Sequence, residues 1–335
     1  MKHDDYFDNF LTNTVNLSKF RLETLEGQVD AIYNDLKADP DLGPRIVKKI
    51  PQGSWAHETI INPVNGLEVD ADFLLQLREE PDWAFDVQQY SNTVWRVLHN
   101  HPTYGRMPHG RKCRCVYVEY ANSTHVDIVP YIVLADGRKV IVNRDENRFE
   151  NTDPEGFTAW MKEKDKIATR NLRKVIRLMK YLRDHKGSFN GVKSILLTTL
   201  LGEQVQPYKK ILDVGYYSDV PTTLLHVVTD LNDYLQANFY KPSVPDPSGS
   251  GVTFDHRWSQ ETYSNFRTRL NVITAQIKAA YDEEDPDDSV KKWQDLFGDK
   301  FQPPKTSTSS SKFGTSAAAA GAAVSTSTGR TGRAG

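Results

Sequence analysis

A chain of 335 residues can hold two domains with separate cores, and its 38% hydrophobic and 26% charged residues are those of an ordinary globular protein. Lys and Arg number 42 against 44 Asp and Glu, so no basic field marks nucleic acid as a stable partner. The two cysteines, Cys113 and Cys115, support neither a disulfide framework nor a zinc site, and we interpret them as reduced core thiols. The sequence contains no signal-peptide core and no apolar run that could span a bilayer, so we expect a cytoplasmic protein without a membrane partner.

The first half of the sequence alternates between helical and strand-like patterns. Apolar residues at a period of 3.6 predict helices, and strict apolar–polar alternation predicts strands. We therefore expect a small mixed or antiparallel sheet flanked by helices. The expected helices cover residues 16–37 and 81–99, a helix start covers 55–59, and the expected strands cover 45–50, 68–75, 113–120, 125–134 and 139–142.

The second half has a mostly helical pattern. It begins at Asp153, which suits an N-cap, with Pro154 at the first helical position. Beyond Pro304 the residues are mostly Ser, Thr, Ala and Gly, which cannot bury enough apolar surface to fold. The sequence thus predicts an α+β protein with a sheet domain and N-terminal helix at residues 1–150, a helical domain at 151–301 and a disordered tail at 302–335.

The strand at residues 68–75 carries two carboxylates on one face. Val69, Ala71, Phe73 and Leu75 alternate with Asp70 and Asp72, so the apolar residues share one side of the strand. Two positions apart on a strand, the acidic residues lie about 6–7 Å apart at Cα and repel each other unless a cation compensates. A solvated acidic edge is the alternative interpretation of such a pair.

Two further features favour a divalent-metal site for phosphoryl chemistry. Gly53 lets the backbone approach a phosphate closely, and Ser54 offers a hydroxyl at a helix start. Asp127, on a later strand, can converge with Asp70 and Asp72 to hold two Mg²⁺ (or Mn²⁺) ions about 3.5–4 Å apart. In this hypothesis Asp70 and Asp72 ligate the metals, and Asp127 also assists deprotonation of the attacking hydroxyl.

These motifs resemble a known family. The strings Ile50-Pro51-Gln52-Gly53-Ser54, Val69-Asp70-Ala71-Asp72 and Val126-Asp127-Ile128-Val129-Pro130 are similar to those of DNA polymerase beta-like nucleotidyltransferases, and more specifically of bacterial CD-NTases. CD-NTases are relatives of cyclic GMP–AMP synthase and oligoadenylate synthase that make the second messenger of CBASS anti-phage systems. The likeness runs from the N-terminal helix to Gly298.

The resemblance implies a bilobal fold, with a nucleotidyltransferase core in residues 1–150, and an activity. The chain would join NTPs, ATP with or without a second nucleotide, into a cyclic di- or trinucleotide and release pyrophosphate. Beside the Asp triad, the resemblance implies nucleotide contacts from Gln52, Gly53, Ser54, Lys180 and Ser194. The bases of the product stay open, because similar motifs serve different nucleotides.

Other residues near these motifs have weaker support. Asp246, in a Pro-rich loop, has two interpretations of equal weight, a contact to a base edge and a plain turn. For the remaining candidates the structural interpretation is favoured: a helix start for His57 and Glu58, and loop solvation for His109, Arg111 and Arg114.

Partners and alternatives are implied by the resemblance as well. A CBASS effector would be reached only through the product. A ubiquitin-transfer-like enzyme would conjugate the tail at Gly335. The alternative for the tail is an unconstrained low-complexity extension. Other branches of the family use a HORMA-domain activator, with DNA as a cofactor of activation. Two alternatives to the synthase are a template-independent RNA nucleotidyltransferase and a regulator that binds nucleotide without turnover.

Overall fold

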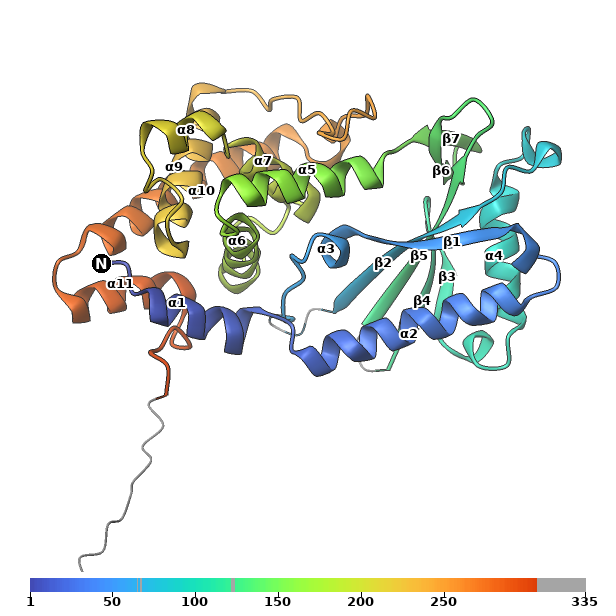
Figure 1. Ribbon diagram of the computed structural model, residues 1–335, viewed down its shortest axis with the longest axis horizontal. Coiled ribbons are helices and arrows are strands. Elements are labelled where there is room, and N and C mark those ends of the chain that lie inside the picture. The colour runs from blue at the N-terminus through green and yellow to red at the C-terminus, as the bar shows by residue number, and fades with distance from the viewer. Residues whose placement is uncertain (65, 67, 122–123, 306–335) are drawn as a thin grey trace, which may run out of the picture. The chain divides into compact units, whose positions relative to one another are not determined.

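A computed structural model describes residues 1–305 except residues 65, 67 and 122–123. Met1–Pro304 form one compact unit, in which the strands lie together with α2 (Lys19–Ala38), α3 (Gly53–Ala56) and α4 (Gln88–Asn100), and the later helices gather in a second region (Figure 1). The predicted division between residues 150 and 151 stays a prediction. None of the described helices is long and apolar enough to cross a membrane.

The described part of the chain contains one seven-stranded mixed sheet. Strand order is β1-β2-β5-β4-β3, and β6 and β7 extend from β5. β2 and β5 are parallel, and every other pair is antiparallel. The strands are β1 (Ile46–Gln52), β2 (Val69–Leu77), β3 (His109–Arg111), β4 (Val116–Tyr120), β5 (Thr124–Val133), β6 (Lys139–Asn143) and β7 (Arg148–Asn151).

Two helices cover the apolar face of this sheet, α2 (Lys19–Ala38) and α4 (Gln88–Asn100). Ser18 caps α2 by accepting a hydrogen bond from the Arg21 amide. The alternating apolar residues of β2 all lie in the core below these helices, which confirms the predicted inward face. Its acidic residues are therefore directed away from α2 and α4.

Seven helices form the second half of the unit around their own apolar core. Asp153 caps the first of them, as predicted, by accepting a hydrogen bond from the Gly156 amide at 3.1 Å. These helices are α5 (Pro154–Ile167), α6 (Leu172–Lys186), α7 (Ser194–Glu203), α8 (Pro207–Leu212), α9 (Val220–Ala237), α10 (Gln260–Asp282) and α11 (Pro286–Phe297).

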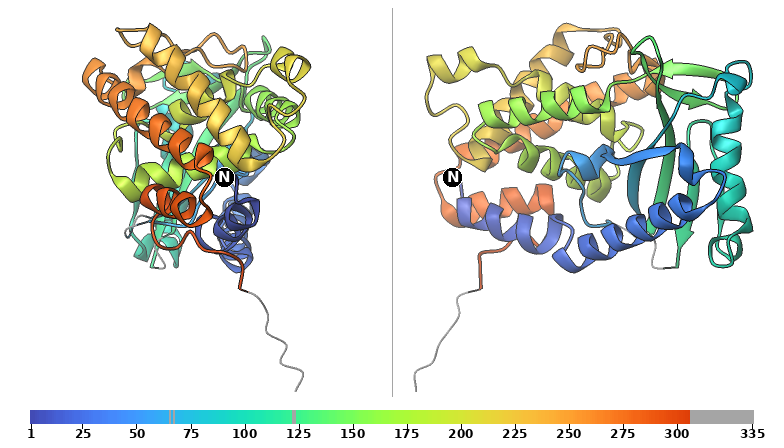
Figure 2. Two further views of the ribbon diagram at one scale, coloured as in Figure 1. Left: turned by 90° about the vertical axis from the view of Figure 1, so that its left-hand side faces the viewer. Right: turned by 45° about the vertical axis from the view of Figure 1, so that its right-hand side comes forward.

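The N-terminal helix packs against this second core rather than against the sheet. α1 (Asp4–Phe10) continues into a π-helical turn, Leu11–Val15, and both lie beside α11 in Figures 1 and 2. The Phe7 ring meets Trp293 edge-on at 5.0 Å between centroids. The sequence pattern missed α1 because the segment is only seven residues long.

Several predicted boundaries were wrong. The predicted helix at 81–99 is a 3₁₀ turn, Pro81–Trp83, followed by α4, and Phe85 in the link between them is 97% exposed although a helix over 81–99 would count it among its apolar residues. Trp83 anchors this segment instead, since its ring packs edge-on against Tyr90. The sequence pattern also missed β3 and β7. The remaining short elements are α3 (Gly53–Ala56) and the 3₁₀ turns Gly43–Arg45, Tyr104–Arg106 and Asp255–Arg257.

Candidate active site

Strand register brings the three predicted carboxylates together. In the parallel pair of β2 and β5, Asp72 lies opposite Asp127 and Asp70 lies opposite His125. Residues opposite each other in neighbouring strands have side chains on the same face, about 5 Å apart. The sheet therefore gathers Asp70, Asp72 and Asp127 on the face that α2 and α4 leave open.

The electrostatics of this cluster follow from crowded, partly buried carboxylates. Burial, followed by the charges of Asp127 and Asp70, raises the pKa of Asp72 to about 7. Burial also raises the pKa of Asp70. For Asp127 burial acts in the same direction, but a hydrogen bond from His125 and the Lys112 charge outweigh it and lower the pKa.

Lys112 and His125 lie near the carboxylates, and the sequence analysis assigned neither of them a role in the site. The His125 Nε2 lies 2.8 Å from Asp127 Oδ1, and Lys112 Nζ lies 3.2 Å from the same oxygen. The two nitrogens are 2.7 Å apart. A signal for His125 existed in the alternation of β5, which places it on the same face as Asp127.

The carboxylates suit hard divalent cations by their chemistry. Oxygen donors are the ligands that Mg²⁺ and Mn²⁺ prefer, and a cation beside Asp72 would offset the burial and the neighbouring negative charges that raise its pKa. As their side chains lie, the described His, Cys, Asp and Glu residues contain no ready-made group of three metal ligands. The donor set therefore fits a cation, while Lys112 supplies positive charge beside Asp127.

Gly53 is set against Asp72 at the end of β1. Gln52, the last residue of β1, pairs with Asp72 in register. Gly53 has φ +63°, and a Cβ at this position would lie 2.5 Å from Asp72 Oδ2. Only glycine adopts this conformation at low cost and leaves room for the carboxylate. Because α3 has only four residues, Ser54 can offer its hydroxyl and backbone amides but little helix dipole.

Two cavities adjoin the carboxylates. The smaller, of about 420 Å³, is lined by Ser54, Asp70, Lys180 and Ser194, among others. The larger, of about 1220 Å³, is bordered by Gln52, Gly53, Asp72 and Asp127 on the sheet and by residues of the helical half. The structure thus divides the predicted site residues between two adjoining spaces. From the half of the unit that contains α5 to α11, the larger cavity is lined by residues that include Phe157, Ile195, Asp246, Phe254 and Arg257.

Lys180 is a buried cation held by neutral groups. Its side chain is 3% exposed, and Nζ donates to the Thr59 carbonyl oxygen at 3.0 Å and to Thr59 Oγ1 at 3.2 Å. No ion pair involves Lys180 within the described part of the chain. Burial, together with the neighbouring Arg183 charge, lowers its pKa to about 7. Ser194, the first residue of α7, accepts a hydrogen bond from Arg183 Nη1 at 3.2 Å.

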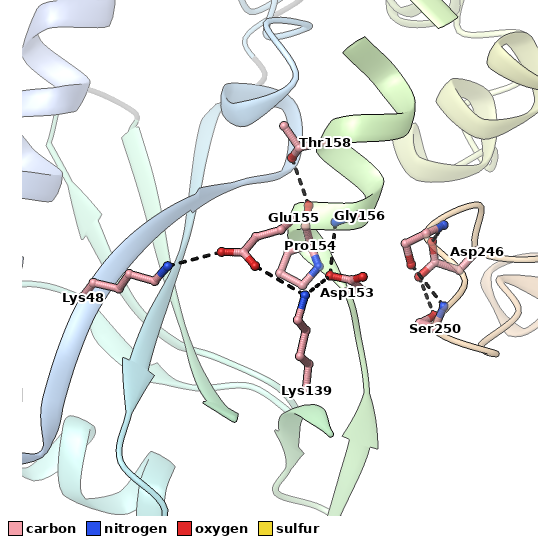
Figure 3. Close-up of polar contacts among 10 residues, drawn as sticks. Lys48, Lys139, Asp153, Pro154, Glu155, Gly156, Thr158, Asp246 and Ser250 are labelled. Atoms are coloured by element: carbon pink, nitrogen blue, oxygen red, sulfur yellow. Dashed lines mark hydrogen bonds and ion pairs between the residues drawn. The ribbon is translucent and has the colours of Figure 1, made fainter. Parts of the chain in front are cut away.

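The carboxylate of Asp246 is already engaged inside its own loop. It accepts hydrogen bonds from the Ser248 amide at 2.9 Å and from Ser250 Oγ at 2.7 Å (Figure 3). Asp246 borders the larger cavity, so both interpretations of this residue keep a structural basis. Gly335 lies outside the described residues.

The other weak candidates have structural partners. His57 stacks on Phe157 at 4.8 Å between centroids, and burial lowers its pKa to about 4. Glu58 pairs with Arg173 at 3.0 Å. The remaining contacts join His109 to His99 and to the Met107 carbonyl oxygen, Arg111 to Trp95 and Asn92, and Arg114 to Glu150.

Comparison with known proteins finds the same architecture. Residues 1–165 match the model of the Second Messenger Oligonucleotide or Dinucleotide Synthetase domain. A c-di-GMP synthase from Roseivirga ehrenbergii is 21% identical over 293 residues, which cover 78% of this chain and 75% of that protein. A probable cyclic AMP-AMP-GMP nucleotide synthase from Salmonella paratyphi B is 24% identical over 183 residues, 54% of this chain and 47% of that protein.

Solved structures with this fold cover nearly all of the described chain. CdnC of E. coli MS115-1 with ATP is 21% identical, with a TM-score of 0.67, over 89% of this chain and 98% of that one. The Vibrio cholerae DncV cyclic AMP-GMP synthase with nonhydrolyzable GTP is 16% identical, with a TM-score of 0.70, over 90% and 97%. At these identities the likeness shows the α+β fold.

Proposed function

Because the chain belongs to the bacterial CD-NTases, a nucleotidyltransferase family that makes cyclic oligonucleotides, we propose that it joins ATP, alone or with a second nucleoside triphosphate, into a cyclic di- or trinucleotide. The observation that carries the proposal is the meeting of two unlike cavities at one carboxylate cluster. Single-ligand pockets span about 300–1,000 Å³, so the larger cavity has room for more than one nucleoside. A cyclic product requires two nucleosides beside one set of reacting groups.

The smaller cavity has the chemistry of a triphosphate site. Lys180 brings a buried amine that pairs with no carboxylate among the described residues, and Ser54 and Ser194 bring hydroxyl donors. Phosphate oxygens would give Lys180 the anionic partner that Thr59 does not provide, which favours the charged form of the amine. The reacting α-phosphate would then lie toward Asp70, at the edge of this cavity.

In the transfer step, the attacking ribose hydroxyl forms a bond to the α-phosphorus while the bond from that phosphorus to the pyrophosphate breaks. Asp127 would accept the hydroxyl proton, and Gly53 would let the backbone approach the phosphate. Asp70, Asp72 and Asp127 would hold the divalent cations, which lower the pKa of the hydroxyl and neutralise the leaving pyrophosphate. For a dinucleotide a second transfer between the joined nucleotides closes the ring, and for a trinucleotide a third does, each with release of one pyrophosphate.

The proposal extends to a place in CBASS defence in the cytoplasm, where the product would reach an effector. One solved neighbour is a complex of CdnC of E. coli MS115-1 with HORMA-deltaN, at 20% identity. That neighbour supports a HORMA-domain protein as a candidate activator. Conjugation of the tail through Gly335 is a separate proposal that rests on the tail sequence.

Incubation of the purified protein with labelled ATP, GTP, CTP and UTP and Mg²⁺ tests the proposal. Small products that resist alkaline phosphatase, with the mass of a cyclic di- or trinucleotide, are expected. Extended RNA would favour the template-independent transferase instead, and binding without incorporation would favour the regulator. Omission of single nucleotides, followed by mass spectrometry, then names the bases.

A further inference from the structure

We propose that His125 is a positioning residue that fixes the carboxylate of Asp127 for nucleotidyl transfer, an inference that rests on the function proposed above. His125 precedes Asp127 by two residues on β5, so both side chains share one face of the sheet. The register also places His125 opposite Asp70. One imidazole ring therefore lies among the carboxylates that would hold the cations.

The ring of His125 has little freedom. The residue is 6% exposed, and its ring stacks on Tyr117 of β4 at 5.1 Å between centroids and 20° between planes. Nδ1 lies 3.7 Å from Glu119 Oε1, and Nε2 lies 2.8 Å from Asp127 Oδ1. The imidazole is thus held between two carboxylates while its face is packed.

The contact to Asp127 has a defined direction. An ionised carboxylate only accepts hydrogen bonds, so the proton between the two groups belongs to His125 Nε2. This bond occupies Oδ1, and Oδ2 has its contact from Lys112 at a longer distance, 3.4 Å. Oδ2 is then the oxygen that can turn to a hydroxyl or a cation.

Lys112 cannot fix the carboxylate of Asp127 in the same way. Its side chain is 49% exposed, and its Nζ lies 2.7 Å from His125 Nε2, where two donors face each other. An ammonium beside Asp127 also competes with any divalent cation for the same oxygens. His125 holds the carboxylate through a donor at a fixed position, whereas Lys112 is able to swing into solvent.

The proposal is consistent with the role of residues that hydrogen-bond metal-ligating carboxylates in other proteins. Ligating carboxylates are commonly hydrogen-bonded by a second layer of residues, whose removal costs roughly 10–100-fold in metal affinity or activity. Without the donor at Oδ1, repulsion from Asp72 would turn the Asp127 carboxylate away from the cluster. The loss should therefore appear in cation binding even without a nucleotide.

The test compares His125→Ala with His125→Gln in the full chain, because the amide nitrogen of Gln can take the place of Nε2. Binding of Mn²⁺ alone is measured by electron paramagnetic resonance at one pH, and melting curves show that each variant is folded. We expect roughly 10–100-fold weaker binding for His125→Ala, and binding within about threefold of the unaltered protein for His125→Gln. His99→Ala, outside the site, is the matched control and should bind normally.

Steady-state kinetics give a second result, in which His125→Ala lowers kcat and leaves KM for nucleotide unchanged, because the smaller cavity is untouched. Unchanged Mn²⁺ binding in His125→Ala, or equal losses in both variants, would overturn the proposal. Normal Mn²⁺ binding without any cyclic product would refute the proposed function and leave the His125 comparison valid. An unaltered protein that binds no Mn²⁺ would overturn both.

Discussion

The two sides of the candidate site are built by different means. On the sheet, three carboxylates converge because the register of β2 and β5 brings them together within one rigid element. On α6, Lys180 reaches the same region from the helical half, and a carbonyl and a hydroxyl of Thr59 hold its ammonium. The sheet thus buries carboxylates close to one another, and the helical half buries an amine that forms no ion pair within the described residues. Both arrangements cost stability until an ion of opposite sign arrives.

The largest effect is expected from Asp72→Asn, which removes one charge from the sheet side. Turnover should fall about a thousandfold or more, since metal-supplied charge stabilisation is worth several kcal/mol and about 1.4 kcal/mol is tenfold. The metal-free protein should become more stable by about 1–2 kcal/mol, because a buried charge is removed and repulsion from Asp127 and Asp70 is relieved. Product assays and urea unfolding check both, with Asp136→Asn on an exposed turn as the control. A variant with normal turnover would refute the role of Asp72.

On the helix side, Lys180→Met should raise KM for nucleotide roughly 10–100-fold, because a charge-assisted phosphate contact is lost. Stability should rise or stay unchanged, since a buried amine is replaced by an apolar chain of similar length. Lys174→Met, on the same helix with a half-exposed side chain, is the matched control. If Lys180→Met lost both folding and nucleotide binding, Lys180 would be needed for stability, and the expected contrast between the two sides of the site would be wrong.

The same variant gives a pH test. The folded pKa of Lys180, about 7, lies below the ordinary value of 10.5, so between these values the folded state binds fewer protons than the unfolded state. Stability of the unaltered protein should therefore rise relative to Lys180→Met as the pH increases from 7 to 10. Unfolding free energies of both proteins across this range check the sign. A constant difference would show that Lys180 is solvated.

Gly53→Ala tests whether the sheet side of the site tolerates a side chain next to Asp72. A Cβ near Asp72 Oδ2, at a left-handed φ, should cost about 1–2 kcal/mol of stability and lower turnover about tenfold. Gly137→Ala is the control, since φ is +86° there but no atom of the described residues lies within 4 Å of the added Cβ. It should lose similar stability with normal turnover. Equal turnover in the two variants would show that the absence of a side chain at Gly53 does not matter for catalysis.

The smallest effect is expected from Lys112→Met. Removal of a half-exposed ammonium beside Asp127 should tighten Mn²⁺ binding about threefold, because a surface ion pair is worth less than about 1 kcal/mol. Titration calorimetry with Mn²⁺ measures this change, with Lys19→Met as a control far from the carboxylates. Weaker binding in Lys112→Met would mean that Lys112 supports the cation site instead of competing with it.

The sequence predicted the sheet side better than the helix side for a physical reason. Alternation with a period of two fixes which face each residue of β2 takes, so the outward direction of Asp70 and Asp72 followed from local pattern. Burial of Lys180 depends on how α6 packs against the segment after α3, which no local pattern encodes. Its motif match suggested a phosphate contact, but a solvated lysine would have given the same sequence.

Other parts of the site could not be predicted from local sequence patterns, because they too depend on how distant segments pack. Lys112 reaches Asp127 only because a turn before β4 returns the chain to β5. The hydrogen bonds that engage Asp246 come from residues two and four positions later, whose loop geometry the Pro-rich composition did not specify. The two cavities exist only in the assembled unit.

The packing of α1 against α11 has a consequence for folding during synthesis on the ribosome. The Trp293 Nε1 donates to the Met1 carbonyl oxygen, a contact that joins residues 292 positions apart. The sheet from Ile46 to Asn151 can assemble while the chain is still emerging from the ribosome, whereas α1 completes its contacts with the second core only when α11 has been made. In chain order, the sheet therefore lies between helices that share one core. Nascent chains that stop before α11 should therefore present the apolar face of α1 to chaperones.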